Sequence, residues 1–423
     1  MSTFRDTNAD NTLEKSTTPG YDSTSRSQEQ RLRIIVSGGG TGGHIYPALA
    51  VATDIERRYG ATILYIGDAD GLETQLVPKA GIKLETIHAG KFLRYWSRET
   101  VEGLVRVPRG FIEARKLVRA FAPQAVFTSG GYVAVPVGIA ARRLNVPVLI
   151  HQQDVLPNLA NRLLSPFATS ISVSFDESLV HFPKAKTQLT GNPVRDEIVK
   201  LAGSDLRVHK RSLDFSPAFP LLVVTGGSQG ARHINEAVVA ALPSLLERFQ
   251  ILHISGQRTY SETFEASQPQ LQPLTEHVRA RYRLVPYLEK EMPIALAAAD
   301  AVIARAGAAT LAELAILGKP SILVPLPPGF SGSPQESNAA MFQANGSALV
   351  VHDQDLTALT LVAAIDDLFA APQTRINMAL SVRTLAHPEA TKELADAVVG
   401  LAQTYTEERK RRAVMQAIQK ASR

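Results

Sequence analysis

The sequence predicts two Rossmann-like α/β domains, each built on a doubly wound parallel sheet, that face each other across a cleft. Three observations support this fold class. The chain has 423 residues, more than one ordinary hydrophobic core accommodates. Apolar strand-like runs alternate with helical patterns, as in parallel sheets with crossover helices. Two glycine-rich loops, Gly38–His44 and Gly226–Gly230, each follow an apolar run and precede a helical pattern.

The first half of the chain alternates between strand and helix patterns from residue 31 to about residue 200. Short apolar runs predict buried strands, and longer stretches with helical periodicity predict the crossover helices. The expected strands are Ile34–Ser37, Thr62–Ile66, Ala125–Thr128, Val146–Ile150 and Ser170–Val173, with helices over Pro47–Tyr59 and Phe111–Phe121.

The alternation restarts after a polar, basic connector. Expected strands of the second half are Leu221–Thr225, Ile251–Ser255, Tyr282–Val285, Ala301–Ile303, Ser321–Pro325 and Ala348–Val351, followed by helical patterns over Glu389–Tyr405 and Glu407–Arg423. We therefore divide the chain into a disordered tail (1–30), an N-terminal domain (31–200), a linker (201–217), a C-terminal domain (218–388) and C-terminal helices with a basic tail (389–423).

Composition excludes several classes of protein. The chain has no cysteine, so it has no disulfide, thiolate zinc site or cysteine nucleophile. It contains no run of about 18 uncharged apolar residues, the length that a transmembrane helix needs. Its first 30 residues are polar and lack the apolar core of a signal peptide. We expect a cytoplasmic protein that does not span a membrane.

Positive charge is concentrated in one stretch. The formal net charge is +5, and residues 79–119 hold ten Lys or Arg against four Asp or Glu. Basic and large apolar residues interleave there, which suits an anionic membrane surface; a solvated helix face beside a buried aromatic cluster is the alternative. No nucleic-acid motif accompanies the stretch. The candidate membrane-facing residues are Lys91, Phe92, Arg94, Tyr95 and Trp96.

Each glycine loop is a candidate phosphate site. A strand that turns on glycines into a helix directs backbone N–H groups and a positive helix end at an anion. The first loop also matches the G-x-G-x-x-G dinucleotide fingerprint, with Asp68 near the place of a ribose-binding acid. A nicotinamide-dependent oxidoreductase is therefore an alternative, although His44 and Pro47 at the start of the helix argue against it.

His44 is the candidate catalytic base. It stands at a helix start, where the dipole disfavours the imidazolium and keeps the ring neutral near pH 7. A neutral imidazole in a cleft can accept a proton from an attacking hydroxyl. The alternative is a histidine that only hydrogen-bonds the loop.

Three further groups carry candidate chemistry. Ser228 in the second loop has donors suited to a diphosphate, with a plain tight turn as the alternative. Glu313 follows a glycine-containing turn and can accept two bonds from ribose hydroxyls, or can simply cap its helix. Asp68 and Asp70 form a D-x-D pair, but we interpret it as a polar turn and expect no metal site.

Taken together, the motifs resemble the MurG family of bacterial peptidoglycan N-acetylglucosaminyltransferases. The resemblance runs from about Arg31 to Pro388, with the motifs in the family's order. Any one motif is modestly specific, whereas the ordered set is strong. The motifs are Gly38–Ala50 (GGGTGGHIYPALA), Ser129–Val133 (SGGYV), His151–Asp154 (HQQD), Gly191–Arg195 (GNPVR), Gly226–Ala231 (GGSQGA), Arg305–Thr310 (RAGAAT) and Gln335–Ala339 (QESNA).

The resemblance implies a GT-B fold and a defined reaction. UDP-N-acetylglucosamine (UDP-GlcNAc) would donate its sugar to the C4 hydroxyl of the muramoyl residue of lipid I, which is undecaprenyl-diphosphate-MurNAc-pentapeptide. The product would be lipid II, formed with inversion in a single displacement at the cytoplasmic face of the membrane. No metal or other cofactor is implied, because helix ends and hydrogen-bond donors can stabilise the departing diphosphate.

The family's site residues carry over by position. The acceptor diphosphate would lie on Gly40, Thr41, Gly42 and Gly43, with His44 as the base. The donor would contact Thr41, Gly42, Gly43, Asp154, Arg195, Ser228, Glu313 and Gln335. Residues 91–96 would lie on the membrane face of the N-terminal domain.

The sequence departs from the family's pattern at three positions. Gln152 and Asp154 stand where the family commonly has Glu and Asn, and Glu336 stands where a second Gln is common. A carboxylate can accept a bond from a sugar hydroxyl but cannot donate one as an amide does. The alternatives are a UDP-sugar transferase with another lipid or natural-product acceptor, and a catalytically silent membrane-surface protein.

Overall fold

The computed structural model describes residues 31–40, 42–89, 98–227, 229–327 and 335–422, with the backbone alone described for residues 98–107. From Leu32 onward the chain forms one compact unit. The predicted disordered tail, residues 1–30, lies outside the described residues. None of the helices in these ranges is long and apolar enough to cross a bilayer.

The first half of this unit is built on a parallel sheet whose strand order is β3-β2-β1-β4-β5-β6-β7. The order reverses between β1 and β4, as in doubly wound folds. The strands are β1 Arg33–Ser37, β2 Thr62–Asp68, β3 Lys83–Ile87, β4 Ala125–Thr128, β5 Val148–Gln152, β6 Ser170–Val173 and β7 Thr187–Leu189.

The second half repeats this plan. Its parallel sheet has the order β10-β9-β8-β11-β12-β13, so the order reverses between β8 and β11. The strands are β8 Leu221–Thr225, β9 Gln250–Ile254, β10 Tyr282–Val285, β11 Ala301–Ala304, β12 Ser321–Leu323 and β13 Leu349–Val350. The GT-B prediction of two parallel-sheet α/β domains is therefore confirmed.

Both sheets are covered by helices on both faces, which is why their central strands are mainly apolar and buried. Ile34 and Val36 of β1 pack into one core and Ile35 into another. Leu222 and Leu221 of β8 divide in the same way between two cores of the second sheet. Successive side chains of a strand point to opposite faces, so each sheet carries two cores.

The helices lie between and around these strands. They are α1 Gly42–Tyr59, α2 Glu73–Lys79, α3 Arg98–Phe121, α4 Ala134–Arg143, α5 Leu159–Leu164, α6 Asp196–Lys200, α7 Leu206–Ser212, α8 Arg232–Leu245, α9 Tyr260–Leu271, α10 Glu276–Arg279, α11 Met292–Ala298, α12 Ala308–Leu317, α13 Gln335–Ala344, α14 Ala358–Phe369, α15 Pro372–Arg383 and α16 Ala390–Ala421.

The structure corrects several of the predicted boundaries. The strand expected at Val146–Ile150 is β5, two residues later, because the Val146 N–H bonds the carbonyl of Ala141 in the turn that ends α4. The helix expected from Pro47 begins at Gly42, so Pro47 lies inside α1 as its sixth residue and not at its start. Edge strands β3 and β7 were not predicted because they are partly exposed and lack an apolar run. The segment expected as a linker contains α7.

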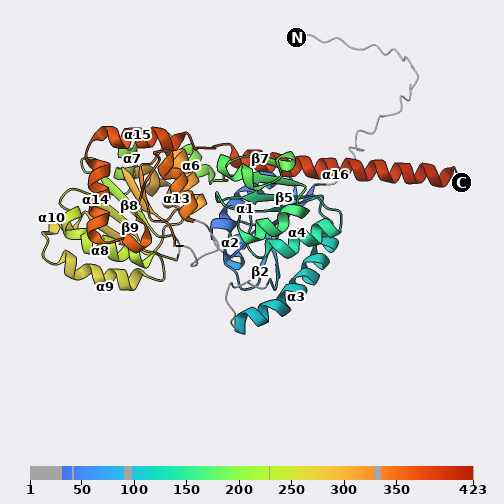
Figure 1. Ribbon diagram of the computed structural model, residues 1–423, viewed down its shortest axis with the longest axis horizontal. Helices are drawn as coiled ribbons and strands as arrows, with labels where there is room; N and C mark the ends of the chain where they lie inside the picture. Colours follow the sequence, from blue (N-terminus) through green and yellow to red (C-terminus); the bar gives the residue numbers. More distant parts are fainter. Residues whose placement is uncertain (1–30, 41, 90–97, 228, 328–334, 423) are drawn as a thin grey trace, which may run out of the picture. The chain divides into compact units, whose positions relative to one another are not determined.

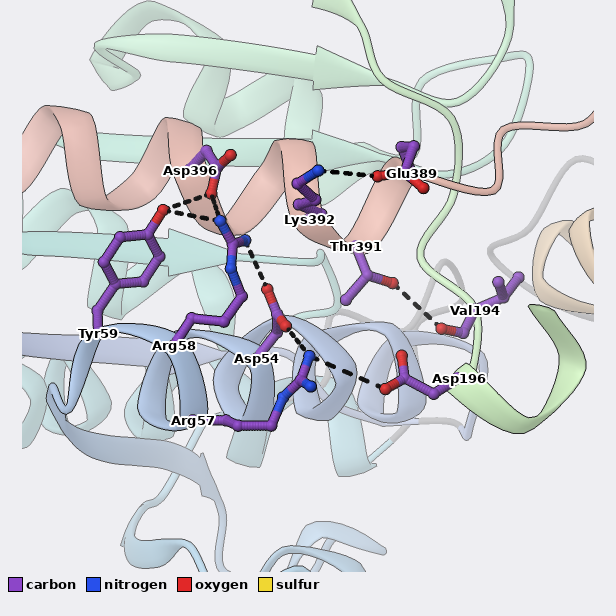
Figure 2. Close-up of polar contacts among 10 residues, drawn as sticks. All are labelled: Asp54, Arg57, Arg58, Tyr59, Val194, Asp196, Glu389, Thr391, Lys392 and Asp396. Atoms are coloured by element: carbon purple, nitrogen blue, oxygen red, sulfur yellow. Dashed lines mark hydrogen bonds and ion pairs between the residues drawn. The ribbon is translucent and has the colours of Figure 1, made fainter. Parts of the chain in front are cut away.

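The two helical patterns expected at the C-terminus form the single helix α16 (Figure 1). Its first turns return to the first sheet: Leu394 and Val398 are buried in the core that contains Ile34. Figure 2 shows the polar contacts that accompany this packing. Asp396 accepts bonds from Arg58 at 2.6 Å and Tyr59 at 2.5 Å.

Candidate active site

The two glycine loops occupy equivalent places in the two sheets. One follows β1 and the other follows β8, and each of these strands lies where its strand order reverses. Ligands of open α/β sheets bind beyond the carboxyl ends of the strands at such switch points. The fold therefore provides two candidate ligand sites, one for each domain.

The first loop is held by close backbone contact with the loop after β4. The Gly39 N–H donates to the carbonyl of Gly130 at 3.3 Å. Gly131 has φ +86°, and a Cβ at this residue would lie 2.2 Å from the Gly39 carbonyl oxygen. Gly40 has φ +90°, which also favours glycine. These glycines shape the loop by permitting left-handed backbone and close approach.

A buried carboxyl supports the same loop. Glu73 is fully buried, and its Oε1 accepts a bond from the Gly40 N–H at 3.3 Å. Burial raises the pKa of Glu73, against the lowering effect of its bonds from backbone N–H groups. Glu73 is a site residue that no motif in the sequence indicates. Its position in the first turn of α2 resembles an ordinary helix-start acid, so only the fold reveals its contact with the loop.

His44 lies in the first turn of α1 with one ring nitrogen already engaged. Its Nδ1 lies 2.9 Å from the carbonyl oxygen of Ser129. A carbonyl only accepts, so Nδ1 carries the proton and the neutral ring keeps its lone pair on Nε2. Burial lowers the pKa of His44 below 6.5, opposed by the charge of Asp154 and by the bond to Ser129. This arrangement suits a base that is neutral at pH 7.

The residues around His44 extend into the second domain. Gln153 also donates to the Ser129 carbonyl, at 3.0 Å. Asp154 is buried, and its Oδ1 accepts a bond from Asn338 of α13 at 2.8 Å. Asn338 also accepts from the Val155 N–H at 2.9 Å. In the sequence Asn338 is one residue of the motif at Gln335–Ala339, and in the structure it joins the segment after β5 to α13.

Gln152 has a local explanation. Its Nε2 donates to the carbonyls of Asp154 and Leu156 at 2.8 and 2.9 Å, while its Oε1 accepts from Asn161 at 2.8 Å. A glutamate could not donate the first two bonds. His151 beside it is fully buried, and burial lowers its pKa to about 4. The Gln152 side chain thus braces the segment that carries Asp154, whereas the His151 ring contacts Ser172 and Asn192.

The second loop contains no ionisable side chain. Gly227 has φ +82° and Gly230 has φ +88°, and a Cβ on Gly230 would lie 2.4 Å from the Ser255 carbonyl oxygen. Helix α8 follows, and its N-cap residue, Ala231, offers no side-chain bond to the helix N-terminus. Backbone N–H groups at such an end suit an anion.

Arg195 and Glu313 are brought together from distant parts of the chain. Arg195 Nη2 lies 2.8 Å from Glu313 Oε1, and the Arg195 side chain also donates to the Glu289 carbonyl. Burial raises the pKa of Glu313, while the neighbouring Arg195 acts to lower it. Glu313 lies in α12, which follows β11 at the switch point of the second sheet. The pair therefore lies at the second candidate ligand site.

Gln335 begins α13, and its Oε1 accepts a bond from the Leu326 N–H at 3.1 Å. Glu336 lies 3.1 Å from His352 Nδ1, so its carboxylate already has a surface partner. Gln335 is therefore tied to the segment after β12, and Glu336 to a histidine.

Asp68 has a structural role at the end of β2. Its Oδ2 accepts a bond from the Tyr132 hydroxyl at 2.6 Å, and its Oδ1 accepts from the Ala89 N–H at 3.3 Å. Within the described ranges, no group of three or more His, Asp or Glu side chains could hold a metal ion. Asp68 is the last residue of β2, and Asp70 lies in the turn that follows it.

Some predicted site residues fall outside the described parts of the chain. These are Thr41 of the first loop, Ser228 of the second loop, and Lys91, Phe92, Arg94, Tyr95 and Trp96 of the membrane-facing stretch. Gly42 and Gly43 are described and form the first residues of α1, directly before His44.

Comparison with known proteins identifies the family. Residues 34–173 match the glycosyltransferase family 28 N-terminal domain, and residues 221–394 match its C-terminal domain. This chain belongs to the MurG family, within glycosyltransferase family 28. As a member of this family, it is a glycosyltransferase.

Relatives of this MurG-family chain cover most of its length. It is 38% identical over 365 residues to the UDP-N-acetylglucosamine–N-acetylmuramyl-(pentapeptide) pyrophosphoryl-undecaprenol N-acetylglucosamine transferase 1 of Bacillus cereus, covering 86% of this chain and 97% of that protein. The transferase of Halothermothrix orenii that carries the same description is 38% identical over 378 residues, covering 87% and 98%. The crystal structure of Acinetobacter baumannii MurG matches with a TM-score of 0.66 and 27% identity, covering 87% of this chain and 99% of that chain.

Proposed function

We propose that this chain transfers GlcNAc from UDP-GlcNAc to the C4 hydroxyl of the MurNAc residue of lipid I, forming lipid II for peptidoglycan synthesis. One observation carries the proposal: the chain is 38% identical across 97% of a relative named for this transfer. The site supports it with two candidate phosphate loops and one candidate base. Each substrate has a diphosphate, which matches the two loops.

The proposed reaction is a single displacement at C1 of GlcNAc. The acceptor C4 oxygen forms a bond to C1 while the bond from C1 to the diphosphate oxygen of UDP breaks. UDP leaves with the electron pair of the broken bond. The hydroxyl proton passes to Nε2 of His44. Its Nδ1–H bond to the Ser129 carbonyl orients the ring and stabilises the resulting imidazolium. Attack opposite to the leaving group inverts the configuration and gives a β1→4 link.

The donor is assigned to the second domain. The UDP diphosphate binds to backbone N–H groups of the second loop, to Ser228 and to the start of α8. Arg195 supplies a positive charge to the same diphosphate. Glu313 accepts bonds from the ribose hydroxyls, and Gln335 and Asp154 contact the sugar. These are our assignments for donor binding.

The acceptor is assigned to the first domain. We assign its diphosphate to Gly40, Thr41, Gly42 and Gly43, next to the start of α1, and we assign Thr41, Gly42 and Gly43 to donor binding as well. The Gly40 N–H that now bonds Glu73 is 3.3 Å from that carboxylate, a long bond that an anion can replace.

We place the reaction at the cytoplasmic face of the cell membrane, with the protein attached peripherally through residues 91–96. The described part of α3 supports this placement. Ile112 is 68% exposed, and Arg115, Lys116 and Arg119 are exposed on the same helix. Such a mixture suits an anionic lipid surface.

The test is transfer of labelled GlcNAc from UDP-GlcNAc to a short-chain lipid I analogue. Formation of the corresponding lipid II analogue supports donor, acceptor and reaction together. UDP-GlcNAc binding without transfer would overturn the acceptor assignment and favour another lipid or natural-product acceptor. Neither binding nor transfer would leave a catalytically silent member of the family.

A further inference from the structure

Helix α16 is longer than the packing that holds it. Leu394, Val398 and Ala402 lie in the core against the first sheet and α1. Every residue from 407 to 422, by contrast, is exposed. We call residues 407–421 the C-terminal arm; at 1.5 Å per residue it is roughly 22 Å long. Figure 1 shows this arm as the projecting end of the red helix.

The arm has the composition of a helix that persists in water. It contains neither Gly nor Pro, and Ala, Arg, Lys, Gln and Glu predominate. Glu408 and Arg412 form an i,i+4 ion pair at 3.5 Å, in the favourable order with the acid first. The arm therefore presents side chains at fixed angles around one helix axis.

Three large apolar side chains share one side of the arm. Val414, Met415 and Ile418 are 58%, 61% and 55% exposed. At 100° per residue they fall within about 100° of arc. Solvated helices keep large apolar residues off such faces unless another surface covers them. The arm thus carries an apolar stripe that the fold does not bury.

Three cations of the arm lie on or beside this stripe, whereas Arg409 and Lys420 lie on the opposite side of the helix. From residue 409 to residue 421 there are five Lys or Arg and no Asp or Glu. Arg411 lies one turn before Val414 on the same side, and Lys410 and Arg412 lie at its flanks, about 90–110° away. Long basic side chains beside an apolar stripe can reach phosphate headgroups while the stripe enters the acyl region.

We propose that the C-terminal arm binds the surface of an anionic lipid bilayer through this apolar stripe and its flanking cations. The inference goes beyond sugar transfer, because the match to the family's C-terminal domain ends at residue 394, before the arm begins. A second copy of the chain fits less well. Its own cations would repel those of the first, and the stripe spans little more than one turn, whereas helix pairing needs several heptads.

The experiment measures binding of the full-length protein to vesicles of phosphatidylcholine with and without 30% phosphatidylglycerol. One variant replaces the stripe: Val414→Gln, Met415→Gln and Ile418→Gln. A second removes charge: Arg409→Gln, Lys410→Gln, Arg411→Gln and Arg412→Gln. The matched control makes three exposed apolar residues of α14 and α15 polar: Leu359→Gln, Ile376→Gln and Leu380→Gln.

We expect wild-type protein and control to bind the anionic vesicles equally, and each arm variant at least about tenfold more weakly. Far-UV circular dichroism checks the fold of each variant. Binding through residues 91–96 is common to all variants, so the comparison isolates the arm. Transfer to a water-soluble acceptor should be unchanged, which separates this test from the proposed function.

Three outcomes would overturn the inference. The first is wild-type protein that does not bind anionic vesicles. The second is a stripe variant that binds as the control does; an RNA-binding arm would give this result, because phosphate contacts need the cations but not Val414 or Ile418. The third is a stripe variant that loses self-association seen in the wild-type protein but binds vesicles as the wild-type protein does. That result would mean that the stripe binds a second copy of the chain.

Discussion

The two glycine loops occupy equivalent positions in two similar sheets, yet their surroundings differ. The first loop has ionisable groups on both sides: Glu73 beneath it and His44 directly after it. The second loop is surrounded by backbone and small side chains, and its candidate site contains the preformed ion pair between Arg195, at the N-terminus of α6, and Glu313 of α12. Proton transfer needs a group that titrates near neutral pH, whereas binding a diphosphate needs donors with fixed charge.

This contrast assigns different tasks to the two halves of one architecture. We infer that the first half performs the proton transfer and the second half holds the donor. Variants in each half should then change different kinetic parameters: turnover or its pH dependence in the first half, and the donor KM in the second.

The largest effect should come from His44→Gln. The glutamine amide can still donate to the Ser129 carbonyl but cannot accept the proton, so turnover should fall at least ~10²-fold with little change in donor KM. The measurement is steady-state transfer of labelled GlcNAc at saturating UDP-GlcNAc. His277→Gln, at an exposed histidine, is the control and should retain full turnover. Turnover within threefold of wild type would remove His44 as the base.

The second-largest effect on the kinetic parameters should come from Glu313→Gln. Loss of the carboxylate weakens a charged hydrogen bond to ribose, so the KM for UDP-GlcNAc should rise roughly tenfold. Because that bond is made equally in ground and transition states, kcat should change little. Initial rates over a range of donor concentrations measure both.

The matched control for Glu313→Gln is Asp366→Asn. It removes the acid of another Arg pair in the same domain, the exposed 2.7 Å contact with Arg248. Its donor KM should equal that of wild type. An unchanged KM in Glu313→Gln would exclude Glu313 from the donor site, and an equal rise in both variants would indicate a general effect on the domain.

The smallest effect on the rate should come from Asp154→Asn, and its main consequence should be a change in the pH dependence of the reaction. Neutral His44 is the working base, so kcat/KM should fall as pH drops through the His44 pKa, which burial places below 6.5. The Asp154 charge raises that pKa, so its removal should move the acid limb to lower pH. The bond from Asn338 can persist to an asparagine oxygen, so the plateau rate should stay within about threefold.

A pH–rate profile from pH 4.5 to 8 measures this shift. Asp196→Asn, at a carboxylate whose side chain is 58% exposed, serves as the control and should leave the acid limb in place. An Asp154→Asn limb that moves to higher pH, or does not move, would contradict the electrostatic coupling of Asp154 to His44.

Local sequence patterns were sufficient for much of the fold. The strands Ala125–Thr128, Ser170–Val173, Leu221–Thr225 and Tyr282–Val285 have the predicted bounds. Strands such as Ala125–Thr128 and Leu221–Thr225, which are buried on both faces, can be recognised in the sequence as apolar runs. Tyr282–Val285 is an edge strand of intermediate burial, and its aromatic and aliphatic residues identify it. The partly exposed edge strands β3 and β7 lack such a run, and they depend on a neighbouring strand for their conformation.

The sequence by itself determined the two glycine loops, the histidine after the first, and the family. Backbone conformations that require glycine, and a helix that starts beside them, are local properties. Tertiary structure decided which distant groups meet: Glu73 beneath the first loop, Asn338 bonded to Asp154, and Arg195 paired with Glu313. These contacts cannot be predicted from the positions of the residues in the sequence. They form only when the parallel strands bring their carboxyl ends together at one edge of each sheet.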